Sequence, residues 1–162
     1  MTLTPPDIVS PPPAVTEAEA LRARVLDSFS RQGLMEHLGA RLVDVERGMV
    51  RIRLPFSRTL TQQHGFFHAG ATTSIADSAA GYAAFTTFPE GSTVLSVEFK
   101  INLVAPARGE WLDAVGSVIR AGRTLTICQS NVYGVSEGKE TLVATGLVTL
   151  IRLPDADDRP AG

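Results

Sequence analysis

Hydrophobic and polar residues alternate in several stretches of this chain, with the period of two that half-buried strands show. One side of residues 49–56 is apolar through Val50, Ile52, Leu54 and Phe56. Arg51 and Arg53 fall on the other side, so the segment predicts a strand with one buried and one wet face. The same pattern predicts strands over 41–48, 94–104, 109–122, 123–134 and 141–153.

Strict alternation within 94–104 turns Ser96 outward and turns five apolar side chains inward, namely Leu95, Val97, Phe99, Ile101 and Leu103. Tight hairpin turns are predicted at three dipeptides that end in glycine: Arg47-Gly48, Ala121-Gly122 and Glu137-Gly138. The last four strands are therefore expected to form a meander.

Residues 69–86 have a different pattern, because small or apolar side chains occur on every side of a helix there. Ile75, Tyr82 and Phe85 provide the bulk, and alanine and glycine keep the helix thin. A helix that is apolar all round is an internal helix. Together with the strands it predicts an α+β fold, in which a curved antiparallel sheet wraps around one long central helix.

A further helix is predicted before the sheet, over residues 16–33. Thr16 and Glu19 can form a capping box at its start, and Gly33 can end it. Residues 34–40 are expected to add one short turn.

The chain has 162 residues, which suits one domain with a buried core. That domain is expected over 16–153, between a disordered proline-rich arm at 1–15 and a flexible tail at 154–162. Hydrophobic residues make up 44%, charged residues 20%, and the net charge is −2, which is ordinary for a soluble globular protein. This balance favours neither a nucleic acid nor a membrane as partner.

Cysteine and histidine are scarce. Cys128 is the only cysteine, so the chain has no internal disulfide, and a reducing cytoplasmic location is expected. The spacing of Cys128, His37, His64 and His68 matches no usual ligand pattern, so neither a metal nor another cofactor is expected.

Asp77 stands out inside the apolar helix, because no other Asp, Glu, Lys or Arg occurs between Gly65 and Phe88. An unpaired buried carboxylate costs several kcal/mol. One explanation is structural: hydroxyls of the same helix, on Thr73, Ser74 or Ser78, could hold the acid. The other explanation is chemical, with Asp77 acting as a base or a nucleophile.

The start of the same helix offers the complementary group. Its first N–H groups have no partners within the helix and carry partial positive charge, which suits a carbonyl oxygen that gains negative charge. Ala69 lies eight residues before Asp77, or about 12 Å along the axis. One chain therefore cannot bring both groups to one bond, whereas two antiparallel helices from two subunits can. The sequence predicts a homodimer with two composite sites.

These residues resemble the hotdog-fold acyl-CoA thioesterases, especially the PaaI-like branch related to phenylacetic acid degradation. That family opens its central helix with His-Gly-Gly and carries an acid nine residues after the His. Here His68, Ala69 and Gly70 open the helix, and Asp77 follows at that spacing. Gln62 matches a family Gln or Asn six residues before the His. The resemblance covers about residues 34–152.

The resemblance implies a role for each matching residue. The Ala69 N–H would polarise the thioester carbonyl, and Asp77 of the partner subunit would act as nucleophile or general base. Gln62 would orient the carbonyl or the water, and His68 would brace the loop. Ser96 matches a family serine that supports the acid, which requires a bulge or an edge position to turn it toward the helix. Ala69 itself departs from the family's glycine.

The implied substrate is a medium-chain or aromatic acyl-CoA, bound between the subunits of a homodimer or of a homotetramer formed by two dimers. Gly70, Phe67 and Tyr82 are expected near the acyl group. Lys100, Arg108 and the family-like Gly122-Arg123-Thr124 hairpin are expected near CoA, with Arg123 and Thr124 in contact. Two alternatives remain open, a hotdog enoyl-CoA hydratase or dehydratase that uses His64 or His68, and a non-catalytic acyl-CoA-binding module.

Overall fold

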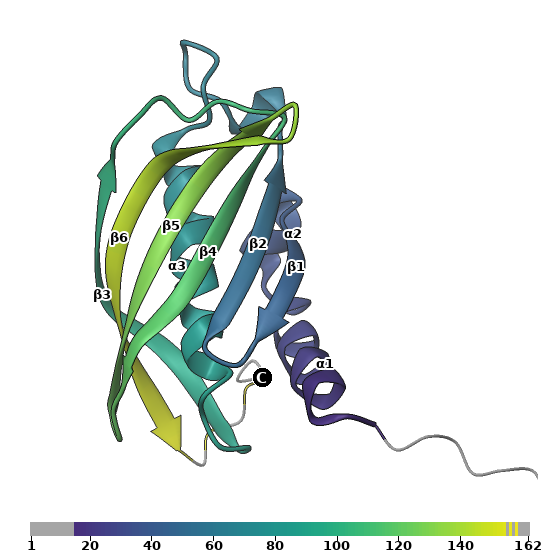
Figure 1. The fold of residues 1–162 in the computed structure, drawn as a ribbon, viewed down its shortest axis with the longest axis vertical. Coiled ribbons are helices and arrows are strands. Elements are labelled where there is room, and N and C mark those ends of the chain that lie inside the picture. The colour runs from purple at the N-terminus through teal and green to yellow at the C-terminus, as the bar shows by residue number, and fades with distance from the viewer. Residues whose placement is uncertain (1–14, 155, 157, 159–162) are drawn as a thin grey trace, which may run out of the picture.

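The computed structural model describes residues 15–154, 156 and 158. Its strands form one antiparallel sheet that curves around a long helix, α3 (Ala69–Phe85), as the sequence predicts (Figure 1). Two shorter helices, α1 (Glu17–Phe29) and α2 (Gly33–Leu38), lie beside one edge of this sheet. The expected disorder of the proline-rich arm and of most of the tail falls outside the described residues.

The strands are β1 (Arg41–Glu46), β2 (Met49–Pro55), β3 (Ser92–Leu103), β4 (Trp111–Ala121), β5 (Leu125–Ser136) and β6 (Lys139–Pro154). Their order across the sheet is β1-β2-β4-β5-β6-β3. The predicted four-stranded meander is therefore wrong at its first member, because β3 pairs with β6 at the far edge and β4 pairs with β2.

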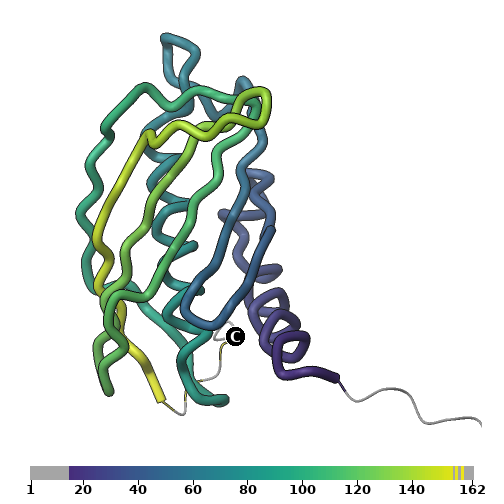
Figure 2. Tube along the Cα trace, viewed as in Figure 1, coloured from purple at the N-terminus to yellow at the C-terminus, as the bar shows by residue number. Residues whose placement is uncertain are grey.

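The connection from β3 to β4, residues 104–110, makes this order possible by crossing one end of the sheet (Figure 2). The Val104 N–H donates to the Val143 carbonyl at 2.9 Å, and the Glu110 N–H donates to the Val135 carbonyl at 2.8 Å. The crossing segment is thus bonded to β6 and then to β5. Alternation predicts which side a residue faces, but it does not predict which strands become neighbours.

The hairpin turns follow the sequence closely. Glu137 and Gly138 join β5 to β6 with φ values of 50° and 74°, the left-handed pair that a tight two-residue hairpin needs. Gly48, with a φ of 82°, turns β1 into β2.

The inner face of β2 is buried as predicted through Val50, Ile52 and Leu54, each fully buried. Phe56 is different: it lies beyond the end of β2 and is 45% exposed, with its ring edge-on to the Phe67 ring.

A β-bulge in β3 changes which residues face the helix. Ser96 pairs with Leu150 and Glu98 pairs with Thr149, so Val97 is an extra residue that has no partner on β6. Leu150 is fully buried on the inner face, and a residue directly opposite shares that face. The bulge therefore turns Ser96 inward.

The prediction for this strand was wrong at Leu95 and Val97, which are 55% and 56% exposed. Phe99 and Leu103 do share the inner face with buried partners on β6, Val148 and Ala144. They remain half exposed, because β3 is the edge strand and no other part of the described chain covers its free edge.

Helix α3 packs on the sheet at very short range. A methyl group built on Gly116 of β4 would lie 2.2 Å from the Ala79 carbonyl oxygen, so only glycine allows this approach. One stripe of the helix is nevertheless left open or half open: Ala69, Gly70, Thr73, Ser74, Asp77, Ser78 and Gly81. The described chain thus covers α3 on most sides but not on all.

The N-terminal helix begins with the predicted capping box, since Thr16 accepts from the Glu19 N–H and Glu19 accepts from the Thr16 N–H. It ends at Phe29, four residues before the predicted end, and Gly33 begins α2 instead of ending α1. Among the described residues, no helix is long and apolar enough to cross a membrane.

Candidate active site

Asp77 lies on the open stripe of α3, half-buried, and accepts a hydrogen bond from the Ser96 hydroxyl at 2.7 Å. The two serine hydroxyls that flank it on its own helix are used elsewhere, and Thr73 makes no side-chain hydrogen bond to it. Ser74 donates to the Gly70 carbonyl at 2.8 Å, and Ser78 donates to Gln32 Oε1 at 3.2 Å. Among the bonds of the described residues, support for the carboxylate therefore comes from the neighbouring strand, not from the flanking serines.

A pocket of about 380 Å³ opens beside Asp77. It lies between α3, the first half of β3 and the segment that joins α1 to α2. Its lining residues are Ser28, Arg31, Gln32, Asp77, Ser78, Gly81, Tyr82, Thr93, Val94, Leu95, Ser96, Leu150 and Asp158.

The start of α3 is capped by His68, whose Nδ1 accepts from the Gly70 N–H at 2.8 Å. No acceptor among the described residues takes the Ala69 N–H, which belongs to the first helical residue. Ala69 is exposed and adopts ordinary helical geometry, since Glu137 is the only non-glycine residue with positive φ in the described chain. The replacement of the family's glycine by alanine thus leaves this donor in place.

A second pocket, of about 460 Å³, opens at this helix start. Gln62, Phe67 and Ala69 line it together with the end of β3 and the crossing segment. The Gln62 side-chain oxygen accepts from the His64 N–H, which leaves the amide NH₂ as the free end of that side chain. Phe67 is 3% exposed, so it forms a wall of this pocket.

The two pockets share no lining residue. The structure brings Asp77 together with Ser96, and it brings Ala69 together with Gln62, His68, Gly70 and Phe67 near the helix start. It does not bring the two groups together within one chain.

The predicted CoA-binding residues also lie in separate parts of the chain's structure. Arg108 lies over the Phe66 ring at 4.3 Å, next to the helix-start pocket. Arg123 and Thr124 lie in the β4–β5 turn at the opposite end of the sheet, where the Thr124 carbonyl accepts from the Arg152 N–H. Lys100 is on the outer face and donates to Asn102 at 2.9 Å.

Tyr82 has a larger structural part than predicted. Its hydroxyl and the Ser28 hydroxyl are 3.2 Å apart, and its ring packs edge-on against Phe29. Burial raises the pKa of Tyr82 to about 12, so the phenol stays protonated. It contributes one wall of the Asp77 pocket while joining α3 to α1.

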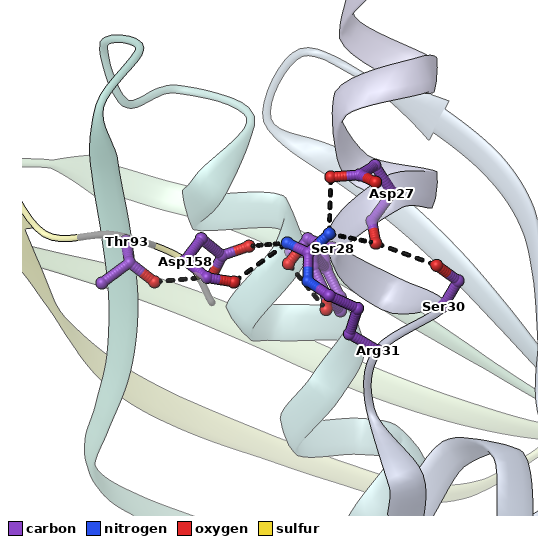
Figure 3. A network of polar contacts seen from close by, with 7 residues as sticks. Asp27, Ser28, Ser30, Arg31, Thr93 and Asp158 are labelled. Carbon is purple, nitrogen blue, oxygen red and sulfur yellow. Dashed lines mark hydrogen bonds and ion pairs between the residues drawn. The ribbon is translucent and has the colours of Figure 1, made fainter. Parts of the chain in front are cut away.

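Sequence reasoning missed a polar network beside this pocket, in which Arg31 pairs with Asp27 and Asp158 (Figure 3). Asp27 and Arg31 are four residues apart, a spacing at which opposite charges on a helix can pair, so the sequence did indicate this ion pair. No sequence pattern indicates that Asp158, some 127 positions away, folds back onto Arg31. No cluster of three or more potential metal ligands occurs among the described residues.

The fold and the comparisons with known proteins place the chain among the hotdog thioesterases. Residues 64–140 match the thioesterase superfamily. A thioesterase family protein from Silicibacter pomeroyi, whose crystal structure is known, is 44% identical, with a TM-score of 0.80 over 83% of this chain and 98% of that one. The chain therefore belongs to the thioesterase superfamily, and it is a thioester hydrolase with the hotdog fold.

More distant relatives agree with this membership. The 1,4-dihydroxy-2-naphthoyl-CoA hydrolase of Listeria monocytogenes is 24% identical over 105 residues, which cover 65% of this chain and 85% of that protein. The E. coli PaaI protein from the phenylacetic acid degradation operon shares the fold, with a TM-score of 0.76 and 16% identity over 85% of this chain and 96% of that one.

Proposed function

We propose that this thioesterase hydrolyses acyl-CoA at two identical sites, each formed by the helix start of one subunit and Asp77 of the other. One observation carries the proposal. The free Ala69 N–H and the Asp77 carboxylate open into separate pockets of a single chain, about 12 Å apart along α3. Two antiparallel α3 helices would place each helix start beside the other's middle.

The β3 edge provides a surface for this pairing. Val97 and Phe99 are 56% and 50% exposed there, and β3 is the last strand of the sheet. An exposed edge strand has unpaired N–H and C=O groups that can pair with another strand. Two β3 strands that run antiparallel would continue the sheet across the dimer and cover the open stripe of both α3 helices.

In such a site the thioester carbonyl oxygen accepts a hydrogen bond from the Ala69 N–H. The helix dipole adds to the stabilisation of the negative charge that develops on this oxygen. Gln62 would orient the carbonyl or the water through its free NH₂ group. His68 is a positioning residue, because its ring fixes the Gly70 N–H and with it the first turn of α3.

The partner subunit's Asp77 would act on the carbonyl carbon in one of two ways. As a general base it takes a proton from a water molecule, whose oxygen attacks the carbon. As a nucleophile it forms a mixed anhydride, which water then cleaves. In both routes the C–S bond breaks, the sulfur leaves as the CoA thiol after gaining a proton, and the acyl group leaves as a carboxylic acid.

Three of the predicted CoA contacts are compatible with the same arrangement, whereas Lys100 lies on the outer face. Antiparallel pairing would bring the end of one sheet that carries Arg123 and Thr124 toward the end of the other that carries Arg108. These side chains would then flank the phosphates of one CoA molecule. The acyl group would extend from Asp77 into the adjacent pocket of about 380 Å³, which suits a medium-length or aromatic group.

The test is the variant Asp77→Asn, which keeps the size of the side chain and the bond from Ser96. We expect it to retain its fold and its dimer and to lose hydrolysis of every acyl-CoA in a panel of short, medium and aromatic substrates, measured by release of free CoA thiol. Hydrolysis at the wild-type rate by a folded Asp77→Asn protein would exclude the proposed site.

A further inference from the structure

Asp158 also lines the Asp77 pocket, and its carboxylate is held by two donors from different elements (Figure 3). Arg31 Nη2 lies 2.9 Å from Asp158 Oδ2, and the Thr93 hydroxyl donates to Asp158 Oδ1 at 2.7 Å. Arg31 comes from the segment between α1 and α2, and Thr93 comes from β3. Arg31 Nη1 is held separately by Asp27, so the guanidinium is fixed in direction.

This group lines the same pocket as the candidate catalytic acid, Asp77. The α1–α2 segment runs beside α3, because Gln32 accepts from Ser78 and Ser28 bonds to Tyr82. From Asp77 to Gly81, which also lines the pocket, is four residues, or about 6 Å along the axis. An acyl group that enters at Asp77 would therefore reach Arg31 within a few methylene groups.

We propose that Arg31 and Thr93 bind the distal carboxylate of a dicarboxylic acyl group, and that Asp158 occupies this position while no such substrate is bound. The substrate class is then an ω-carboxyacyl-CoA, and the inference rests on the proposed function of Asp77. An arginine and a hydroxyl that already hold one carboxylate have the geometry and charge to hold another. Exchange of one carboxylate for the other leaves the charge around Arg31 unchanged.

The surroundings favour a polar end over a long alkyl chain. Ser28, Gln32 and Thr93 line the same part of the pocket. Arg31 and Asp158 also line a neighbouring cavity of about 280 Å³, so the ion pair separates this cavity from the Asp77 pocket. An uncharged acyl chain would abut the Arg31–Asp158 ion pair, whereas a terminal carboxylate could take the place of Asp158 beside Arg31.

The experiment compares adipyl-CoA with hexanoyl-CoA, which have the same number of acyl carbons and differ in the terminal carboxylate. We expect the wild-type kcat/KM to favour adipyl-CoA, and Arg31→Gln to lower it for adipyl-CoA by about 10- to 100-fold, as for a lost charge-assisted hydrogen bond. Hexanoyl-CoA should change less than about threefold. Asp158→Asn should raise kcat/KM for adipyl-CoA, because it removes the competing charge.

Arg22→Gln is the matched control, since Arg22 is exposed on α1 and its one side-chain hydrogen bond among the described residues goes to the Val43 carbonyl. Thr93→Val removes one donor without changing shape and should reduce the preference for adipyl-CoA even if Arg31→Gln fails to fold. The proposal would be overturned if Arg31→Gln lowered kcat/KM equally for both substrates. It would also be overturned if the wild type preferred hexanoyl-CoA and Asp158→Asn left this preference unchanged.

A failure of the proposed acyl-CoA hydrolysis would give a different result from a failure of the carboxylate site. If the wild type hydrolyses neither substrate, binding of both CoA esters by calorimetry still tests the carboxylate site. Tighter binding of adipyl-CoA by the wild type than by Arg31→Gln supports it, and equal binding excludes it.

Discussion

Ala69 is the residue whose backbone, and not its side chain, is proposed to act. Proline at this first helical position fits the helix but has no N–H, and His68 already has the extended backbone that a following proline needs. Ala69→Pro should therefore fold normally and lose about 10²–10³ in kcat, as for one lost oxyanion donor. Ala69→Gly, which keeps the donor, should stay within a few-fold of wild type. Similar kcat values for the two variants in a thiol-release assay would exclude a role for this N–H.

Ser96 is a positioning residue for Asp77 through their 2.7 Å hydrogen bond. Ser96→Ala should lower kcat by about tenfold or more, because the carboxylate loses its fixed direction, while KM changes little. Ser96→Thr keeps a hydroxyl and should recover part of the rate. A purely structural role would instead lower the melting temperature and leave the kcat of the folded protein unchanged.

Asp113 shows how a single buried charge on the outer face of the sheet is stabilised. Burial by itself would raise the pKa of Asp113, but the hydrogen bonds and charges of Arg53 and Arg51 outweigh burial and hold this pKa below its ordinary value. A carboxyl with a lowered folded-state pKa stabilises the fold above the unfolded pKa of about 4, and the contribution is lost as pH falls through the folded pKa.

Asp113→Asn is therefore expected to lower the free energy of unfolding by about 2–3 kcal/mol at pH 7. This is below the range for a fully buried pair, because both arginines keep contact with water. Urea denaturation at several pH values should show the difference from wild type shrink as pH falls below about 4. A difference that stays constant down to pH 3 would mean that the ion pair is not its cause.

At the scale of elements, the fit between α3 and the sheet depends on Gly116. A Cβ there would lie 2.2 Å from the Ala79 carbonyl oxygen, whereas a Cβ on Gly81 would meet only a Leu150 methyl at 3.8 Å. Gly116→Ala should destabilise the protein by about 1–3 kcal/mol through overpacking. Gly81→Ala is the matched control and should be neutral or stabilising, as alanine favours a helix interior. Thermal unfolding of both variants compares them, and equal melting temperatures would contradict the short contact.

Local patterns predicted the two longest helices and all six strands, but not every arrangement of these elements. The central helix and the faces of most strands followed from periodicity, and the lone acid and the free helix start followed from one short segment. The place of β3 could not be predicted, because it depends on how residues 104–110 bond across two other strands. The inward turn of Ser96 depends on one extra residue, Val97, that alternation cannot detect. The Arg31–Asp158 pair joins positions far apart in sequence, and neither position alone suggests the other.

At the scale of the whole molecule, composite sites make a prediction that a self-contained site does not. Asp77→Asn and Ala69→Pro should each give inactive homodimers. After equal amounts of the two are denatured together and refolded, half of the dimers are mixed, and each mixed dimer has one site with neither substitution. About one quarter of the wild-type activity should therefore return. If both groups acted within one chain, every site would keep a defect, and the mixture would stay inactive.

The extra residue in β3 also affects how relatives of this protein should be compared. Because the ladder passes from the Ser96–Leu150 pair directly to the Glu98–Thr149 pair, a chain without Val97 could pair these strands in regular register and still present the hydroxyl to the acid. A one-residue gap at this point of an alignment would then mark a straighter strand. It would not indicate that the serine, or the chemistry it supports, has been lost.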